Sequence, residues 1–139
     1  MAKSYWLFKS EPETYSFSQL LRDQTTNWNG VRNFQARNFL KQAQKGDLAL
    51  IYHSGKDKAV VGIAKVTEGA YPDPDLKKPG EWVQIRIAPV SSFSRTIPLS
   101  ELKSHPELKN LMLIKQSRLS VMPVSPEHFD LLRELGGQK

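Results

Sequence analysis

The sequence predicts an α+β domain, a small and mostly antiparallel β-barrel decorated with short helices. Three observations support this fold class. Strand-like segments occur from one end of the chain to the other, the helical segments between them are short, and the two kinds do not alternate in regular βαβ order. The 139 residues are enough for one domain, spanning 1–139, that buries its own hydrophobic core.

The first strand and the first helix have clear start and stop signals. Residues 4–9 are rich in aromatic side chains and predict a strand that is buried on both faces near its middle. A proline within residues 10–13 ends this strand, because proline lacks the N–H group that a strand ladder needs. Ser16 and Gln19 then have the spacing of a capping box, which predicts a short helix.

A turn that leads into a second helix follows. Asn29 and Gly30 form a strong turn dipeptide, because both residues tolerate positive φ, and the turn would leave Trp28 at the lip of the next element. Asn33 is the predicted N-cap. An apolar stripe then continues at helical spacing to a predicted C-cap at Gly46.

Arg32 and Arg37 lie close to the start of this predicted helix. A helix N-terminus carries a partial positive charge, so a cation there costs about 0.3–1 kcal/mol. A bound anion such as a phosphate would reverse that penalty. The alternative is that one arginine pairs with a nearby carboxylate and that Trp28 is a core residue.

The middle of the chain predicts neighbouring antiparallel strands. Residues 47–52 and 59–66 are apolar and β-branched, and the short link between them predicts a hairpin. Gly62 within the second strand indicates a bulge or a close backbone approach. Residues 71–80 contain three prolines and predict a surface loop, whereas residues 82–87 alternate as a strand with one apolar and one polar face.

The last third predicts short elements. Residues 91–98 are compatible with an edge strand because they include a proline. Residues 99–103 and 106–110 each predict a single helical turn, and residues 118–124 alternate as a late strand. Ser125, followed by proline at the first helical position, begins a final helix.

The composition favours a polyanion as partner. Lysine and arginine number 20 against 14 acidic residues, giving a formal charge of +6 and a pI near 9.6. The lack of cysteine excludes disulfides and thiolate zinc sites. No apolar run has the length of a membrane span, and no signal-peptide core precedes the first strand. We therefore expect a cytoplasmic protein.

Metal, cofactor and triad chemistry are not indicated. His53, His105 and His128 lie in different predicted elements without regular ligand spacing, so no metal site is expected. No Gly-rich phosphate loop is present, so no cofactor is expected. His53, Ser54 and Asp57 are too close together on one turn to suit a catalytic triad.

Aromatic and hydrogen-bonding residues at the ends of elements form the candidate site. Recognition of a nucleobase needs a flat π surface, worth about 1–3 kcal/mol per base, and donors and acceptors that match the base edge. The alternative is that Trp6 and Tyr52 are core residues and that the polar ones are caps and turns. The residues in question are Trp6, Lys9, Ser10, Glu11, Trp28, Tyr52, His53, Ser54, Gln116, Ser117 and Arg118.

The sequence resembles the EVE domain family, and the resemblance covers nearly the whole chain. It is carried by four segments that occur in the same order as in the family. These are residues 6–12 (WLFKSEP), 28–38 (WNGVRNFQARN), 51–54 (IYHS) and 116–124 (QSRLSVMPV). Four ordered segments are far more specific than any one of them.

The resemblance implies a PUA-like β-barrel, related in architecture to YTH and ASCH domains, with a pocket that reads modified bases in DNA or RNA. Animal nuclear members of the family carry a long basic extension, whereas this chain begins almost at its first strand. We therefore expect a bacterial, cytoplasmic protein without a nuclear role. The implied pocket residues are Trp6, Lys9, Ser10, Trp28, Val31, Asn33, Tyr52, His53, Ser54, Gln116, Ser117 and Arg118.

The hypothesis that follows is a non-catalytic reader, with no metal, no cofactor and no membrane, and with a monomer favoured. A modified base, such as 5-methylcytosine, would enter a pocket walled by Trp28 and Trp6. The expected edge readers are Ser10, Asn33, Ser54 and Gln116, and the expected phosphate contacts are Arg32, Arg37 and Arg118.

The alternative is an ASCH-like amidohydrolase that acts on a modified nucleoside. Lys9 and Glu11 could supply a base and an acid if burial lowered the lysine pKa, and Ser10 could hydrogen-bond to the substrate. Adjacent strand residues point in opposite directions, so Lys9 and Ser10 are not expected to face one pocket without a bulge.

Overall fold

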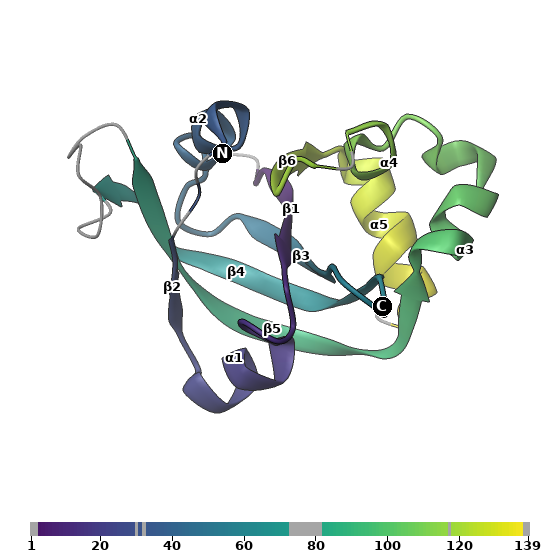
Figure 1. Cartoon of the computed structure of the whole chain (residues 1–139), viewed down its shortest axis with the longest axis horizontal. Coiled ribbons are helices and arrows are strands. Elements are labelled where there is room, and N and C mark those ends of the chain that lie inside the picture. The colour runs from purple at the N-terminus through teal and green to yellow at the C-terminus, as the bar shows by residue number, and fades with distance from the viewer. Residues whose placement is uncertain (1–2, 30, 32, 73–81, 117, 138–139) are drawn as a thin grey trace.

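The computed structural model describes residues 3–29, 31, 33–72, 82–116 and 118–137 (Figure 1). These residues form one mixed six-stranded sheet with short helices. The elements are β1 Tyr5–Ser10, α1 Phe17–Asp23, β2 Thr26–Trp28, α2 Phe34–Leu40, β3 Leu48–His53, β4 Ala59–Pro72, β5 Val83–Pro98, α3 Leu99–Ser104, the 3₁₀-helix η1 Pro106–Leu108, α4 Met112–Lys115, β6 Val121–Val124 and α5 Pro126–Leu135. None of the described helices is long and apolar enough to cross a membrane.

The strand order is β2-β5-β4-β3-β1-β6, and β1 and β3 are the only parallel neighbours among the described strands. The prediction of a mostly antiparallel α+β fold is therefore confirmed. The prediction of a closed barrel is wrong, because the sheet is open, with β2 and β6 at its edges. The rings of Phe8 on β1 and Trp28 on β2 lie 5.6 Å apart, so side chains bring together two strands that are not neighbours in the sheet.

Strand β1 passes through the middle of the core, as its aromatic sequence predicts. Leu7 and Phe8 are fully buried, and Trp6 is nearly so. The parallel register pairs Lys9 with Tyr52 and Ser10 with the last residue of β3. The carboxyl ends of β1 and β3 consequently lie side by side.

The helix starts predicted from the sequence are confirmed. Ser16 Oγ accepts a hydrogen bond from Gln19 N at 3.1 Å, and Gln19 Oε1 accepts one from Ser16 N at 2.8 Å, which completes the capping box of α1. Asn33 Oδ1 accepts from Ala36 N at 2.9 Å and caps α2. Ser125 Oγ likewise caps α5.

The predicted end of the second helix is wrong. Helix α2 stops at Leu40, well before the predicted C-cap at Gly46. Gln42 N and Ala43 N donate to the carbonyls three residues earlier, so the chain continues after α2 as a tighter, 3₁₀-type turn. Trp28 belongs to the short strand β2, which the sequence does not predict, and the turn predicted at Asn29 and Gly30 includes Gly30, which lies outside the described residues.

The long hairpin of β4 and β5 contains the predicted close approach at Gly62. The register shifts between Val60 and Gly62, and a Cβ atom on Gly62 would lie 2.6 Å from Phe17 Cζ and 2.8 Å from Ser91 O. Both strands are longer than predicted. Residues 91–98 continue β5, Tyr71 belongs to β4, and residues 73–80 of the predicted loop lie outside the described residues.

A buried carboxylate ties the start of β1 to the turn before β3. Asp47 is 6% exposed, and its Oδ1 accepts from Ser4 N at 3.1 Å. Its Oδ2 accepts from Trp6 Nε1 at 3.0 Å and from Gln44 N at 2.9 Å. One side chain thus satisfies three donors that come from two segments far apart in the sequence.

We expect Asp47→Ala to lower the free energy of unfolding by about 2–4 kcal/mol, because three donors, one of them buried, lose their acceptor. Urea denaturation followed by circular dichroism measures this change. The control is Asp57→Ala, at an exposed position, which should stay within about 0.5 kcal/mol of the wild type. Equal stabilities of the two variants would contradict the assigned role of Asp47.

The end of β3 is joined to α1 through a histidine. Phe17 N donates to His53 Nε2 at 3.0 Å, so the ring must be neutral to accept this bond. Burial lowers the pKa of His53 from its ordinary value of 6.5, and the Glu11 carboxylate opposes this shift.

A histidine whose pKa is lowered by folding contributes stability that is fully present above pH 6.5 and is lost as the pH falls through the folded-state value. We therefore expect the free energy of unfolding to decrease between pH 7 and pH 5. His53→Gln keeps an acceptor that does not titrate, so this variant should show a smaller decrease in chemical denaturation over the same range. An unchanged pH dependence in His53→Gln would show that the histidine does not contribute.

Candidate functional site

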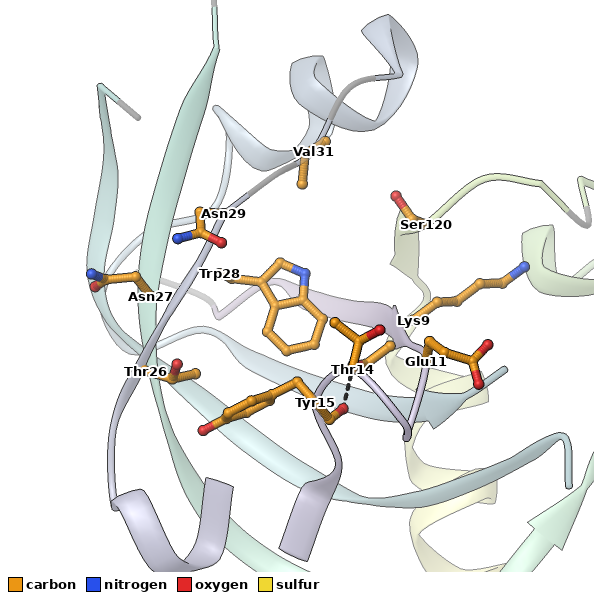
Figure 2. A pocket seen from close by; sticks show the side chains of 11 residues that line it. Lys9, Glu11, Thr14, Tyr15, Thr26, Asn27, Trp28, Asn29, Val31 and Ser120 are labelled. Atoms are coloured by element: carbon orange, nitrogen blue, oxygen red, sulfur yellow. Dashed lines mark hydrogen bonds between the residues drawn. The ribbon is translucent and has the colours of Figure 1, made fainter. Parts of the chain in front are cut away.

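A cavity of about 580 Å³ lies at the carboxyl end of β1 (Figure 2). Its volume falls within the range of about 300–1,000 Å³ that small-molecule sites commonly have. The segment after β1, strand β2 with the residues that follow it, and the residue before β6 form its walls. The lining residues are Lys9, Ser10, Glu11, Thr14, Tyr15, Thr26, Asn27, Trp28, Asn29, Val31 and Ser120.

Trp28 supplies a flat aromatic wall. Its half-buried indole packs on Phe8 at 5.6 Å with an interplanar angle of 30°. The backbone of Trp28 is fixed by pairing of β2 with Ile85 of β5. Figure 2 shows the indole between Tyr15 and Val31, in the middle of the lining residues. The ring is therefore held in place before any ligand arrives.

The opposite wall is polar and carries both signs of charge. Lys9 and Glu11 lie together on this side, away from Trp28 (Figure 2). Burial lowers the pKa of Lys9, and its Nζ lies 5.7 Å from the centre of the Tyr52 ring. Ser10 Oγ donates to the carbonyl of Tyr15, and this bond holds the segment after β1 in place.

Lys9 and Ser10 both line the cavity, contrary to the expectation from strand alternation. Ser10 is the last residue of β1, and the cavity surrounds the strand end, so side chains from both sides of the strand reach it. The backbone N of Lys9 donates to Ser120 O at 2.9 Å, which places Ser120 on the same wall.

Four of the predicted pocket residues line the cavity: Lys9, Ser10, Trp28 and Val31. Trp6 does not, although the sequence analysis places it opposite Trp28. Its indole is 3% exposed, donates to Asp47 and packs near Phe39. The slot between two indoles is therefore corrected to a cavity with one indole wall.

Three predicted residues on or next to β3 lie behind the cavity wall. Tyr52 is 2% exposed beneath Lys9, and His53 accepts the hydrogen bond from α1. Ser54 Oγ donates to Glu11 Oε2 at 3.5 Å, so it contacts the wall without lining the cavity.

The remaining predicted residues lie elsewhere. Asn33 uses its side-chain oxygen to cap α2, and Arg37 lies on that helix near exposed aromatic rings. Gln116 is the C-cap of α4 and is exposed, as is Arg118. Arg32 and Ser117 are outside the described residues.

Several lining residues are not predicted from the sequence. Asn27 and Asn29 flank Trp28, and recognition of β2 as a strand would have identified them. Asn27 Oδ1 accepts from Tyr71 Oη at 2.6 Å and from Arg86 Nε at 3.3 Å. Four more lining residues give no local signal in the sequence, because only the folded chain brings them to the end of β1. These are Thr14, Tyr15, Thr26 and Ser120.

No group of three or more histidine or acidic side chains suited to a metal ion occurs among the residues that the structure describes. The cavity instead combines a π surface with amide, hydroxyl, ammonium and carboxylate groups. Such a wall can bind a planar ligand that has both donors and acceptors on its edge.

Comparisons with known proteins agree with this fold. Thymocyte nuclear protein 1 from Gallus gallus is 38% identical, with the match covering 97% of this chain and 69% of that protein. The human form is 36% identical, with 95% and 73% covered. The YTH domain of MmI1 is 11% identical with a TM-score of 0.58 over 96% of this chain and 94% of that one, which shows the shared PUA-like fold alone.

Two solved structures are close in both sequence and fold. A protein from Pseudomonas putida is 41% identical with a TM-score of 0.89, covering 95% of this chain and 99% of that one. Human THYN1 protein, solved in complex with DNA that contains 5-methylcytosine, is 35% identical with a TM-score of 0.88 and covers 99% of each chain. The family model described as EVE domain matches residues 4–135. The chain therefore belongs to the EVE domain family.

Proposed function

We propose that this protein binds DNA carrying a modified cytosine, and that the modified base leaves its stack and enters the cavity beside Trp28. The observation that carries the proposal is the cavity itself, in which one fixed indole faces a wall of donors and acceptors. The human relative solved with 5-methylcytosine DNA supports the choice of ligand.

Stacking on Trp28 offsets the cost of removing the base from the duplex. Unstacking and unpairing cost a few kcal/mol, and a base stacked on an aromatic ring recovers about 1–3 kcal/mol. Because Phe8 already holds the indole, little side-chain entropy is lost on binding. Hydrogen bonds to the base edge supply the remaining binding free energy.

The charged wall suits an aminopyrimidine. The Lys9 ammonium only donates hydrogen bonds and matches the ring acceptors, whereas the Glu11 carboxylate only accepts and matches an exocyclic amine. Cytosine offers both features. Val31, on the other side of the cavity, gives an apolar contact for a 5-methyl group.

The basic segment around the cavity favours a polyanion. Residues 24–46 contain four lysines or arginines and no acidic residue. We propose that Arg32, Arg37 and Arg118 contact phosphates, and binding should then weaken as salt rises. Four further expectations stay predictions: binding of RNA, a monomeric state, a single domain over 1–139 and a cytoplasmic location. The matched animal relatives are named as nuclear proteins.

We expect Trp28→Ala to weaken binding of a 5-methylcytosine oligonucleotide about 10–100-fold, because the stacking surface is lost. Fluorescence anisotropy with a labelled oligonucleotide measures the affinity, and thermal unfolding checks that the variant folds. Trp28→Phe keeps an aromatic ring on Phe8 and serves as the control, with a loss of about threefold or less. Full affinity in a folded Trp28→Ala variant would overturn the proposal.

The amidohydrolase is the second candidate, and one observation favours it. Burial lowers the pKa of Lys9, and Lys9, Ser10 and Glu11 share the cavity. In its neutral form, the Lys9 amine could take a proton from a water molecule that attacks an amide carbon of the substrate. The amide C–N bond would then break, and the protonated amine would return the proton to the leaving nitrogen.

Incubation with N4-acetylcytidine, followed by chromatography, separates the two candidates. We expect no turnover above that of a Lys9→Met variant, because a reader only binds the nucleoside. Release of acetate and cytidine by the wild type but not by Lys9→Met would favour the enzyme.

A further inference from the structure

An exposed aromatic group lies next to the cavity on α2. Phe34 is 61% exposed, the highest value among the large apolar side chains that are exposed in the described residues. Its ring stacks on Trp82, directly before β5, at 5.1 Å and 27°. The guanidinium carbon of Arg37 lies 4.9 Å from the Phe34 ring centre and 5.4 Å from the ring centre of Trp82. We name these three residues the Phe34 platform.

The Phe34 platform is built to present a flat ring. Trp82 supports the phenyl ring by stacking, and Arg37 braces both rings through cation–π contacts. Leaving such a ring in water forfeits the burial that a core position would give it. A ring held in this way offers a flat face on which another planar group can stack.

The position of the Phe34 platform links it to the cavity. Val31 lines the cavity and Phe34 begins α2, so the two are three positions apart and at most about 11 Å of chain separates them. In Figure 1, α2 follows the upper end of β2, the strand that carries Trp28. One short oligonucleotide could therefore contact both.

The charge of the segment that carries Phe34 and Arg37 favours a polyanion as partner. Residues 24–46 carry four cations and no acidic residue, which suits a phosphate backbone. A flat ring beside a guanidinium is the combination that stacks unpaired bases and holds their phosphates.

We propose that the Phe34 platform is a second stacking site, which receives an unpaired base next to the modified base held in the cavity. This inference rests on the proposed function, because the first base positions the second. The protein would accordingly prefer modified cytosine within a single-stranded or locally opened segment over the isolated nucleoside.

The test compares two probes by isothermal titration calorimetry. One is the nucleoside 5-methyl-2′-deoxycytidine, which reports on the cavity alone. The other is a single-stranded heptamer of thymidines with one central 5-methylcytosine, which reports on both sites. We expect Phe34→Ala to weaken heptamer binding about tenfold and to leave nucleoside binding unchanged.

Three further variants separate stacking from other roles. Phe34→Tyr keeps the ring and should retain heptamer affinity within about twofold. Leu21→Ala removes another exposed apolar side chain, on α1, and should change neither affinity. Arg37→Gln should lower the slope of log affinity against log salt by about 0.7, whereas Phe34→Ala should leave that slope as in the wild type.

Several results would overturn the inference without touching the proposed function. Unchanged heptamer affinity in Phe34→Ala, with nucleoside binding intact, would remove the second site. An equal loss for both probes would show that Phe34 only supports the cavity. A change confined to self-association in sedimentation would assign the ring to a protein contact. If the wild type binds neither probe, the proposed function fails and this inference fails with it.

Discussion

The contact between Phe8 and Trp28 is the interaction on which the candidate site depends. Phe8 is fully buried in β1, and Trp28 comes from the edge strand β2, which is separated from β1 by three strands of the sheet. Their rings meet at 5.6 Å and bring the two strands together without a backbone ladder. This contact places the Trp28 indole on the wall of the cavity at the carboxyl end of β1.

Local signals account for what could be predicted from the sequence. The capping box at Ser16 and Gln19 and the caps at Asn33 and Ser125 depend on neighbouring residues, so spacing alone identifies them. Gly62 is predicted for the same reason, because a glycine within a β-branched strand indicates a close approach. The resemblance to the EVE domain family predicts four of the residues that line the cavity, namely Lys9, Ser10, Trp28 and Val31.

Contacts between distant residues account for the errors. Strand β2 has only three residues, and its pairing of Trp28 with Ile85 joins positions that no local pattern relates. Trp6 and Trp28 look alike in sequence as aromatic residues near polar ones. Asp47, 41 positions along the chain, accepts a hydrogen bond from the Trp6 indole and so favours its burial in the core. Within the described residues, the Trp28 indole has no such carboxylate acceptor. Closure of the sheet depends likewise on whether the edge strands β2 and β6 pair, and these strands are far apart in the sequence.

The most direct measurement uses the three tryptophans as separate reporters. Their indole N–H signals, assigned with single Trp→Phe variants, can be followed by NMR as 5-methyl-2′-deoxycytidine is added. If the cavity binds the base, the Trp28 signal should shift in proportion to occupancy, while the buried Trp6 signal stays in place. An unmoved Trp28 signal under saturating ligand, or a shift of the Trp6 signal as large as that of Trp28, would contradict the assignment of this cavity as the base site.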